Sequence, residues 1–213
     1  KANFTKKLDS TIHEIFYTNW EQRSKTIYRY DTKGRVTEIS LNEPNPGVGS
    51  WRETSFLYNS DDQVTEENEY SWDGPGTPIT YRHQHNFTYS GSNLMERISQ
   101  IQTPQVPQWT PNSKTGFSYN STGKKLEEIW YFWNSGAQQW DPQRKTVNTY
   151  DNSDKLTESS GNKWNKISLQ WIDHDSRHEY FYDSLNQLSS ENYFVWNPIS
   201  AQWHHRWKGE YSY

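Results

Sequence analysis

A turn motif that begins with tyrosine recurs along the chain at nearly constant spacing. The first copy is YDTKGRVT at Tyr30, and the chain ends at Tyr213, where a seventh copy would begin. The related copies between them begin at Tyr58, Tyr89, Tyr119, Tyr150 and Tyr182. The intervals are 28, 31, 30, 31, 32 and 31 residues, a regularity that indicates tandem structural repeats, each packed on its neighbours.

Each repeat has the pattern of a β-hairpin. In the residues that precede Tyr30 and Tyr213, the aromatic side chains keep to alternate positions, as Trp20 and Tyr28 do in the first case. This period of two is typical of a strand with two unlike faces. Each tyrosine is followed by a short run of turn-forming residues and then by a second strand-like segment, such as RVTEISL or KLEEIWYF.

The composition favours a thin sheet over a thick core. Hydrophobic residues make up 31% of the chain and aromatic residues alone 16%, so aliphatic side chains are scarce. The mean hydropathy of −1.20 is compatible with disorder, but disordered chains are poor in aromatic residues. We therefore expect narrow seams of aromatic rings to stabilise the sheet.

Tryptophan marks the other end of each hairpin. The last three complete repeats contain WNSGAQQW, WNKISLQW and WNPISAQW, in which six residues separate two indoles that would face each other across a hairpin loop. Rows of exposed indoles are surfaces on which sugar rings stack, although the same rings could instead form the core of a thin sheet. The candidate ligand-binding face comprises Trp72, Trp109, Trp133, Trp140, Trp164, Trp171, Trp196 and Trp203.

Charge follows the same period. Glutamate recurs eight residues after the tyrosine, and basic residues cluster five to seven residues before it, so the hairpin register predicts acid beside base on adjacent strands. The net charge of −4 is spread along the chain, which makes nucleic acid an unsuitable partner. There is no cysteine and no apolar run long enough for a transmembrane segment.

We therefore predict an all-β fold in which tandem β-hairpin repeats form an elongated or rolled antiparallel meander of about twelve to thirteen strands. Residues 1–19 would be an N-terminal half repeat or cap, and residues 20–213 one array of about six repeats. A closed β-barrel and a small propeller are the architectural alternatives, and two strands per repeat argue against propeller blades, which have about four. The proline-rich segment Thr103–Asn112 is expected to be an irregular loop or an edge.

The chain lacks the sequence motifs of common catalytic centres, including phosphate-binding loops and nucleophile elbows. His83 and His85 share one strand face, but a metal ion would need a third ligand from elsewhere. The glutamate column supplies neighbouring acids such as a glycosidase uses, yet each has a base nearby. We predict no catalytic residues, no metal site and no cofactor, and a glycoside-active enzyme is the third-ranked hypothesis for function.

The first tyrosine motif resembles the YD repeat of the RHS family. It matches the family pattern at Tyr30, Asp31, Gly34, Arg35 and Thr37, and later copies keep the tyrosine and often the aspartate. The tryptophan hairpin and the composition look like those of secreted tandem-repeat proteins of Bacteroidota. This resemblance implies a long antiparallel sheet, a scaffolding or adhesive role without catalysis, and a secreted or bacterial cell-surface location.

Together these observations predict a non-catalytic module that binds a glycan or another surface protein through its aromatic face. The alternative is a structural segment of a larger secreted assembly or RHS-like toxin shell, with self-association through sheet edges. Asp9-Ser10-Thr11 and Asp183-Ser184-Leu185 also resemble Bacteroidota O-glycosylation sites, which makes Ser10 and Ser184 candidate glycosylation positions.

Overall fold

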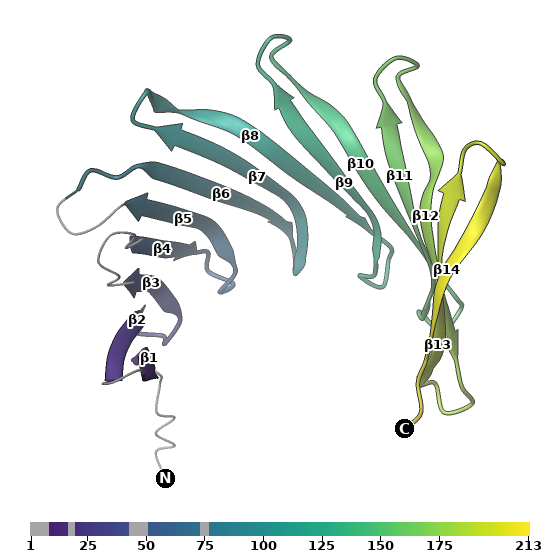
Figure 1. The fold of residues 1–213 in the computed structure, drawn as a ribbon, viewed down its shortest axis with the longest axis horizontal. Helices are drawn as coiled ribbons and strands as arrows, with labels where there is room; N and C mark the ends of the chain where they lie inside the picture. The colour runs from purple at the N-terminus through teal and green to yellow at the C-terminus, as the bar shows by residue number, and fades with distance from the viewer. Residues whose placement is uncertain (1–8, 17–19, 43–50, 73–76) are drawn as a thin grey trace. The chain divides into compact units, whose positions relative to one another are not determined.

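The computed structural model describes residues 9–16, 20–42, 51–72 and 77–213, and in these residues it contains strands and no helix. Figure 1 shows the strands following one another in chain order. Their bounds are β1 Ser10–Phe16, β2 Trp20–Tyr30, β3 Val36–Asn42, β4 Trp51–Tyr58, β5 Val64–Trp72, β6 Tyr81–Ser90, β7 Asn93–Thr103, β8 Val106–Tyr119, β9 Lys125–Asn134, β10 Gln139–Tyr150, β11 Leu156–Asn165, β12 Gln170–Tyr182, β13 Leu188–Asn197 and β14 Gln202–Glu210.

The strands form one sheet in which each pairs with its neighbours in the chain. The hydrogen-bonded order runs from β1 to β14 without a crossover, and the registers are antiparallel. The predicted all-β antiparallel meander is confirmed. Because β1 and β14 are the two ends of this order in the described residues, the closed barrel and the propeller were wrong alternatives. The described residues contain 14 strands, where about twelve to thirteen were predicted.

The chain divides into two compact units. The N-terminal unit consists of Lys1–Phe87 with Ile98–Asn112, and the C-terminal unit consists of Thr88–Arg97 with Ser113–Tyr213. Strands β6, β7 and β8 therefore contribute residues to both units. The prediction of a cap at residues 1–19 followed by a single array stays a prediction.

The tyrosine motif recurs because its turn has a specific hydrogen-bond pattern. The Asp151 carboxylate Oδ1 accepts the backbone N–H groups of Ser153 at 2.8 Å and Lys155 at 3.0 Å. In five of the six copies the fourth residue after the tyrosine has a positive φ, for example 82° at Gly123 and 59° at Asp154; in the copy at Tyr89 the residue with positive φ is Gly91. The loop therefore requires two things: a side-chain acceptor directly after the tyrosine, and a residue that tolerates the left-handed conformation.

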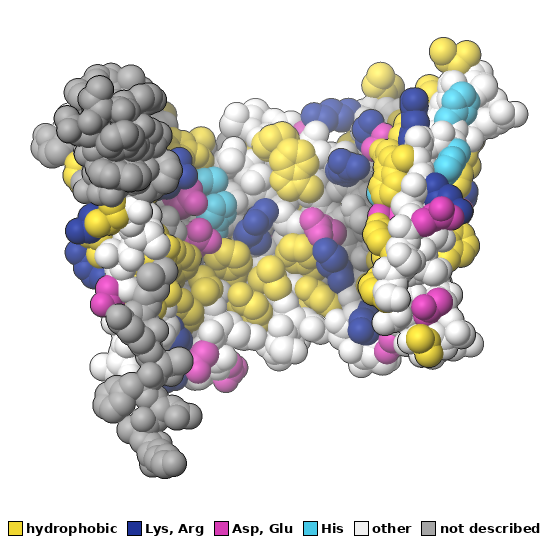
Figure 2. Space-filling view, turned by 60° about the horizontal axis from the view of Figure 1, so that its bottom comes forward, with side chains coloured by type: hydrophobic (Ala, Val, Ile, Leu, Met, Phe, Trp, Pro, Cys, Tyr) yellow, Lys and Arg dark blue, Asp and Glu magenta, His cyan; other side chains and the backbone are white. Residues whose placement is uncertain are grey.

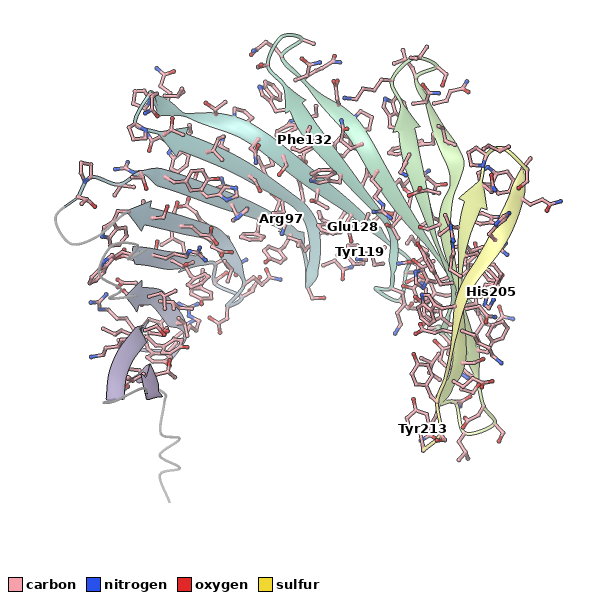
Figure 3. The ribbon with its side chains drawn as sticks, in the orientation of Figure 1. Arg97, Tyr119, Glu128, Phe132, His205 and Tyr213 are labelled. Atoms are coloured by element: carbon pink, nitrogen blue, oxygen red, sulfur yellow. The ribbon has the colours of Figure 1, made fainter. Side chains whose placement is uncertain are left out.

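The tyrosine itself connects consecutive repeats. The hydroxyl of Tyr150 donates to the backbone carbonyl of Lys125 at 2.9 Å, a residue of the preceding repeat. Figure 3 labels Tyr119, whose hydroxyl makes the same bond to the carbonyl of Leu94 at 2.8 Å. Tyr58 and Tyr182 bond to Val36 and Leu156 in the same way. Each hydroxyl ties one repeat to the strand before it, which explains why phenylalanine does not replace tyrosine at these positions.

The tryptophan loops have their own turn chemistry. Asn134, Asn165 and Asn197 follow the first tryptophan of each pair, and each Oδ1 accepts a backbone N–H from within the loop, at 2.9–3.0 Å. The loops then pass through a residue with positive φ, which is 54° at Leu169 and 51° at Ala201. The asparagine of the WN pairs is thus the capping residue of the loop.

No hydrophobic side chain in the described part of the chain is buried. The most buried residues are polar: Asn68, Ser99, Thr115 and Asn162. Figure 2 shows hydrophobic side chains at the surface, interspersed with charged and polar ones. The aromatic seams predicted from composition are therefore half exposed, and the sheet offers ring surface to solvent.

The proline-rich segment was predicted to be an irregular loop or an edge, and of these the irregular loop is wrong for most of it. Strand β7 ends at Thr103 and β8 begins at Val106, so Pro107 and Pro111 lie inside a strand. The register between β8 and β9 begins at Ser113. A proline has no backbone N–H to donate to a neighbouring strand. These two prolines are tolerated because they precede the part of β8 that pairs with β9.

Candidate functional site

The C-terminal unit contains the predicted tryptophan pairs. Trp133 and Trp140, Trp164 and Trp171, and Trp196 and Trp203 are direct cross-strand partners. Their ring centroids are 5.0, 5.1 and 5.4 Å apart, and the ring planes are nearly perpendicular at 66°, 69° and 70°. The prediction that the indoles face each other across the hairpin loop is confirmed for these three pairs. Such edge-to-face contacts are favourable geometries for aromatic rings.

Each of these pairs is accompanied by a cation from the preceding repeat. The Lys145 Nζ lies 5.2 Å from the ring centroid of Trp171. In the neighbouring repeats Lys114 lies 5.7 Å from Trp140 and Arg177 lies 5.0 Å from Trp203. All three bases are five residues before a motif tyrosine. We call this arrangement of three indole pairs and three cations the tryptophan–cation ladder.

The cations of the ladder also have carboxylate partners. Lys145 lies 3.8 Å from Glu127, Lys114 lies 3.4 Å from Glu96, and Arg177 lies 2.9 Å from Glu179. The expected acid beside base on adjacent strands is thus present for Lys145 and Lys114, whereas Arg177 and Glu179 lie on the same strand, β12. Each of the three cations therefore contacts both an aromatic ring and a carboxylate, so the charged groups of the ladder already have partners within the protein.

In the N-terminal unit the repeat departs from this pattern at two positions. Seven residues after Trp72, where the ladder has a second tryptophan, the chain has Ile79. Five residues before Tyr58, where the ladder has a base, it has Glu53. Trp72 instead pairs across β4 and β5 with Trp51, at 6.3 Å and an interplanar angle of 21°.

A surface depression of about 360 Å³ lies where the two departures occur. Its lining consists of Glu53, Ser55, Tyr70, Trp72, Thr77 and Ile79. Glu53 and Tyr70 are direct partners in the β4–β5 register, which places them on the same face of the sheet as Trp51 and Trp72. Ile79, which is smaller than the tryptophan of the ladder, lines this space. We call this the Trp72 depression.

Three polar side chains of the Trp72 depression have no partner within the described residues. The Glu53 carboxylate, the Ser55 hydroxyl and the Tyr70 hydroxyl make neither a hydrogen bond nor an ion pair there. In the ladder, by contrast, Glu127 pairs with a lysine. A half-buried carboxylate beside two free hydroxyls and an indole can accept hydrogen bonds from the hydroxyl groups of a ligand.

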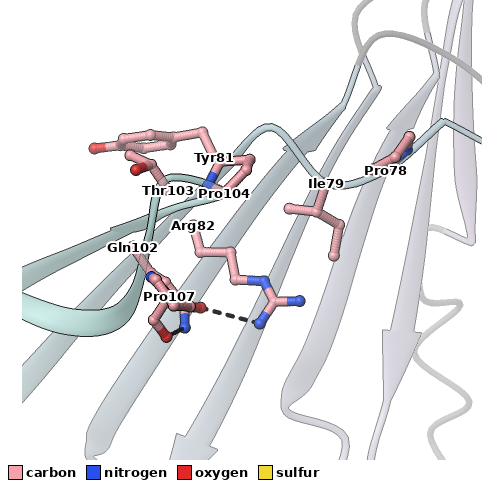
Figure 4. A pocket seen from close by; sticks show the side chains of 8 residues that line it. All are labelled: Pro78, Ile79, Tyr81, Arg82, Gln102, Thr103, Pro104 and Pro107. Carbon is pink, nitrogen blue, oxygen red and sulfur yellow. Dashed lines mark hydrogen bonds between the residues drawn. The ribbon is translucent and has the colours of Figure 1, made fainter.

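A second depression of about 190 Å³ adjoins the first, and both are lined by Ile79. Figure 4 shows the Arg82 side chain lying between Gln102 and Ile79. The Arg82 Nη1 donates to the Gln102 Oε1 at 3.0 Å, and the Gln102 amide donates in turn to the Pro107 carbonyl. Other lining residues are Pro78, Tyr81, Thr103, Pro104 and Pro107. We call this the Arg82 depression.

The remaining predicted residues do not converge on a site. Trp109 is half buried in β8 and makes no ring contact with the described residues. Ser10 is exposed at the start of β1, and Ser184 is exposed in the turn after β12. The rings of His83 and His85 lie 4.1 Å apart. Across the described ranges, the acidic and histidine side chains form no group of three or more suited to a metal ion.

Glu53, Tyr70, Ile79 and Arg82 were not among the residues chosen from sequence. A signal for two of them was nevertheless present. When the repeats are aligned on their tyrosines, position −5 is basic at Lys25, Lys114, Lys145, Arg177 and Lys208 and acidic at Glu53. Likewise Trp72 alone, of the four tryptophans at position +14, lacks a second tryptophan seven residues later.

Comparisons with known proteins show the fold and no family. Neither the protein-family models nor the curated proteins give a match. A protein of unknown function from Bacteroides fragilis superposes with a TM-score of 0.51 at 23% identity, over 61% of this chain and 91% of its own. This chain therefore shares its fold with that Bacteroides protein.

Two further solved structures are less similar. A DUF3836 family protein from Bacteroides vulgatus has a TM-score of 0.37 and 18% identity, over 45% of this chain and 91% of its own. A structure of TcdB2-TccC3 has a TM-score of 0.44 and 10% identity, over 92% of this chain and 11% of its own. Within the described residues, no helix has the length and apolar character needed to cross a membrane.

Proposed function

We propose that this chain is a non-catalytic glycan-binding module of an RHS-like repeat protein, and that the Trp72 depression is its binding site. The observation that supports the proposal best is a group of polar side chains without partners at a hollow where the tryptophan repeat changes. Glu53, Ser55 and Tyr70 have acceptors and donors that no described residue engages, and Trp72 lies beside them.

The chemistry of the lining suits a sugar. The C–H face of a pyranose ring stacks on an indole, and a carboxylate accepts hydrogen bonds from ring hydroxyls. The volume of about 360 Å³ is at the small end of the range for ligand pockets, which is about 300–1,000 Å³. One or two sugar units of a longer polymer would fit, and the open surface would let the polymer continue in both directions.

A binding role is better supported than a hydrolytic one. Glycoside hydrolysis ordinarily needs two carboxyl groups about 5–10 Å apart. Among the described residues, Glu53 is the one carboxylate in the lining of the two depressions. We place the module in a secreted or cell-surface protein, in line with the resemblance of its tyrosine motif to YD repeats.

Affinity gel electrophoresis against a panel of soluble polysaccharides, followed by calorimetry, tests the proposal. We expect Trp72→Ala to abolish retention by the polymer that the wild-type protein binds, and Glu53→Gln to weaken it about tenfold because a charged acceptor is lost. Trp133→Ala is the matched control, because Trp133 holds the same repeat position in the ladder.

The control separates the proposed site from the aromatic face as a whole. If Trp133→Ala lowers affinity as much as Trp72→Ala does, the binding surface is the ladder. If no polymer retards the wild-type protein, the glycan-binding proposal is wrong.

A structural role is the second candidate, and the tyrosine bonds between repeats favour it. Four motif hydroxyls bond to the preceding repeat, an arrangement that extends along an array of any length. In this case further repeats or copies would pair with the outer strands of the sheet. Concentration-dependent association in analytical ultracentrifugation, without polysaccharide binding, would support it.

A further inference from the structure

From the Arg82 depression we infer that the bound glycan is acidic, with a neutral sugar unit at Trp72 and an adjacent unit carrying a carboxylate or sulfate group at Arg82. This inference rests on the proposed glycan-binding function and adds the chemical class of the ligand. It depends on three features of Arg82: its unpaired charge, its fixed orientation and its place beside the first depression.

The charge of Arg82 has no counterpart in the described residues. Its side chain is half buried, yet it makes no ion pair there, and its hydrogen-bond partner is the uncharged amide of Gln102. Other half-buried bases differ: Arg35 pairs with Asp31 at 2.6 Å, and Arg177 with Glu179 at 2.9 Å. A guanidinium that is partly removed from water without an anionic partner favours binding of an anion.

The orientation of Arg82 is fixed before any ligand binds. Gln102 accepts one N–H of the guanidinium, and Gln102 is itself held by the Pro107 carbonyl. The guanidinium carbon also lies 5.9 Å from the ring centroid of Tyr70. A guanidinium offers five N–H donors in one plane, so those not used by Gln102 remain for the two oxygens of a carboxylate or sulfate.

The position of Arg82 makes the two depressions neighbouring subsites. Ile79 lines both, and Tyr70 lines the first while lying beneath the charge of the second. One ligand chain can therefore place a neutral ring against Trp72 and an acidic unit against Arg82. With a net charge of −4, the protein as a whole does not attract polyanions, so affinity for them requires a local site of this kind.

Four polymers in affinity gels test the inference: polygalacturonate, its fully methyl-esterified form, dextran sulfate and dextran. Each pair shares a backbone and differs in charge. We expect retention by at least one of the charged polymers and about tenfold weaker binding to its uncharged form. The carboxylated and sulfated arms show which anionic group the site accepts.

Substitutions of Arg82 then test whether this residue causes the preference for the charged polymer. Arg82→Gln should remove the preference for the charged polymer, and Arg82→Lys should restore only part of it, because lysine keeps the charge and loses the planar fork. Arg97→Gln is the control for the loss of one positive charge, since Arg97 is exposed and belongs to the other unit (Figure 3). Circular dichroism and urea unfolding confirm that each variant is folded.

Four results would overturn the inference, and they differ in scope. Equal binding of charged and uncharged polymers would show that the ligand is not selected by charge, and equal effects of Arg82→Gln and Arg97→Gln would show that Arg82 does not hold the charged group; both leave glycan binding intact. Binding to none of the four polymers, with retention by another neutral polysaccharide, would also exclude an acidic ligand. Retention by no polysaccharide at all would overturn the proposed function together with this inference.

Discussion

The tryptophan–cation ladder of β8–β14 and the Trp72 depression beside β4–β5 come from the same repeat and differ in what their side chains bond to. In the ladder, an indole meets a second indole and a base, as Trp171 meets Trp164 and Lys145. In the depression, Ile79 stands in place of the second indole and Glu53 in place of the base, and the side chains of Glu53, Ser55 and Tyr70 have no polar partner among the described residues. In this array the regular positions build the scaffold, and the proposed binding site lies at irregular ones.

The largest stability difference between the two regions should come from their tryptophans. Trp171→Ala removes an edge-to-face contact and a cation–π contact, so we expect the free energy of unfolding to fall by about 2 kcal/mol, less than the 3–5 typical of a fully buried ring. Trp72→Ala should cost about 1 kcal/mol, because one side of its ring borders a hollow. Urea titration measures both, and equal losses would show that the two regions are equally supported.

The hydroxyls of Tyr150 and Tyr70 test the same difference between the two regions, with smaller expected changes in the free energy of unfolding. Tyr150→Phe removes a bond to the Lys125 carbonyl and should cost about 1 kcal/mol. Tyr70→Phe removes a hydroxyl that has no partner in the described residues, so stability should change by less than about 0.5 kcal/mol while glycan affinity falls. A large stability loss in Tyr70→Phe would mean that this hydroxyl serves the fold.

The tryptophan loops offer a stabilising change that the depression does not. Leu169 has a φ of 54°, a conformation that costs a residue with a Cβ about 1–2 kcal/mol. Leu169→Gly should therefore raise stability by about 0.5 kcal/mol after the entropy cost of glycine is subtracted. Gly123→Ala, at a φ of 82°, is the inverse control and should be destabilising. Thermal denaturation reports both, and the same sign for the two changes would contradict this explanation.

The smallest effect concerns pH and the tyrosine turns. The backbone N–H of Lys155 that bonds to the Asp151 carboxylate lowers the pKa of that group in the folded state. A lowered folded-state pKa gives stability that is present above the unfolded pKa of about 3.9 and is lost as the pH falls through the folded value. Asp151→Asn keeps the acceptor, as Asn120 does in the preceding repeat, and removes the titration.

The urea midpoint of the wild-type protein should therefore exceed that of Asp151→Asn by more at pH 7 than at pH 3. An identical difference at the two pH values would show that the carboxylate does not contribute through its ionisation.

Much of this fold follows from local chemistry and was predicted for that reason. The spacing of the tyrosines gave the hairpins, and the WN segments gave the tryptophan pairs, because turn residues and cross-strand partners are set by short-range rules. Pro107 and Pro111 were expected in an irregular loop or an edge, and they lie in a strand, since a proline is tolerated wherever the neighbouring strand needs no donor.

The residues of the proposed binding site were harder to predict. Glu53 differs from the bases at the same repeat position, but Arg82 is an ordinary charged strand residue in the sequence, and the significance of both depends on which neighbours lack a matching charge. Tyr70 resembles Tyr131, which holds the same repeat position and contacts Lys114 at 4.9 Å. The pairing of β4 with β5 shows that Glu53, which stands where Lys114 does in its repeat, lies directly opposite Tyr70.

Restoring the regular repeat at the irregular site tests the central claim most directly. The double variant Glu53→Lys with Ile79→Trp gives the Trp72 depression the base and the second indole of the ladder. We predict that polysaccharide retention in affinity gels disappears while the free energy of unfolding, measured with urea, stays the same or rises. A double variant that folds with unchanged stability and still binds the same polysaccharide with unchanged affinity would contradict the account.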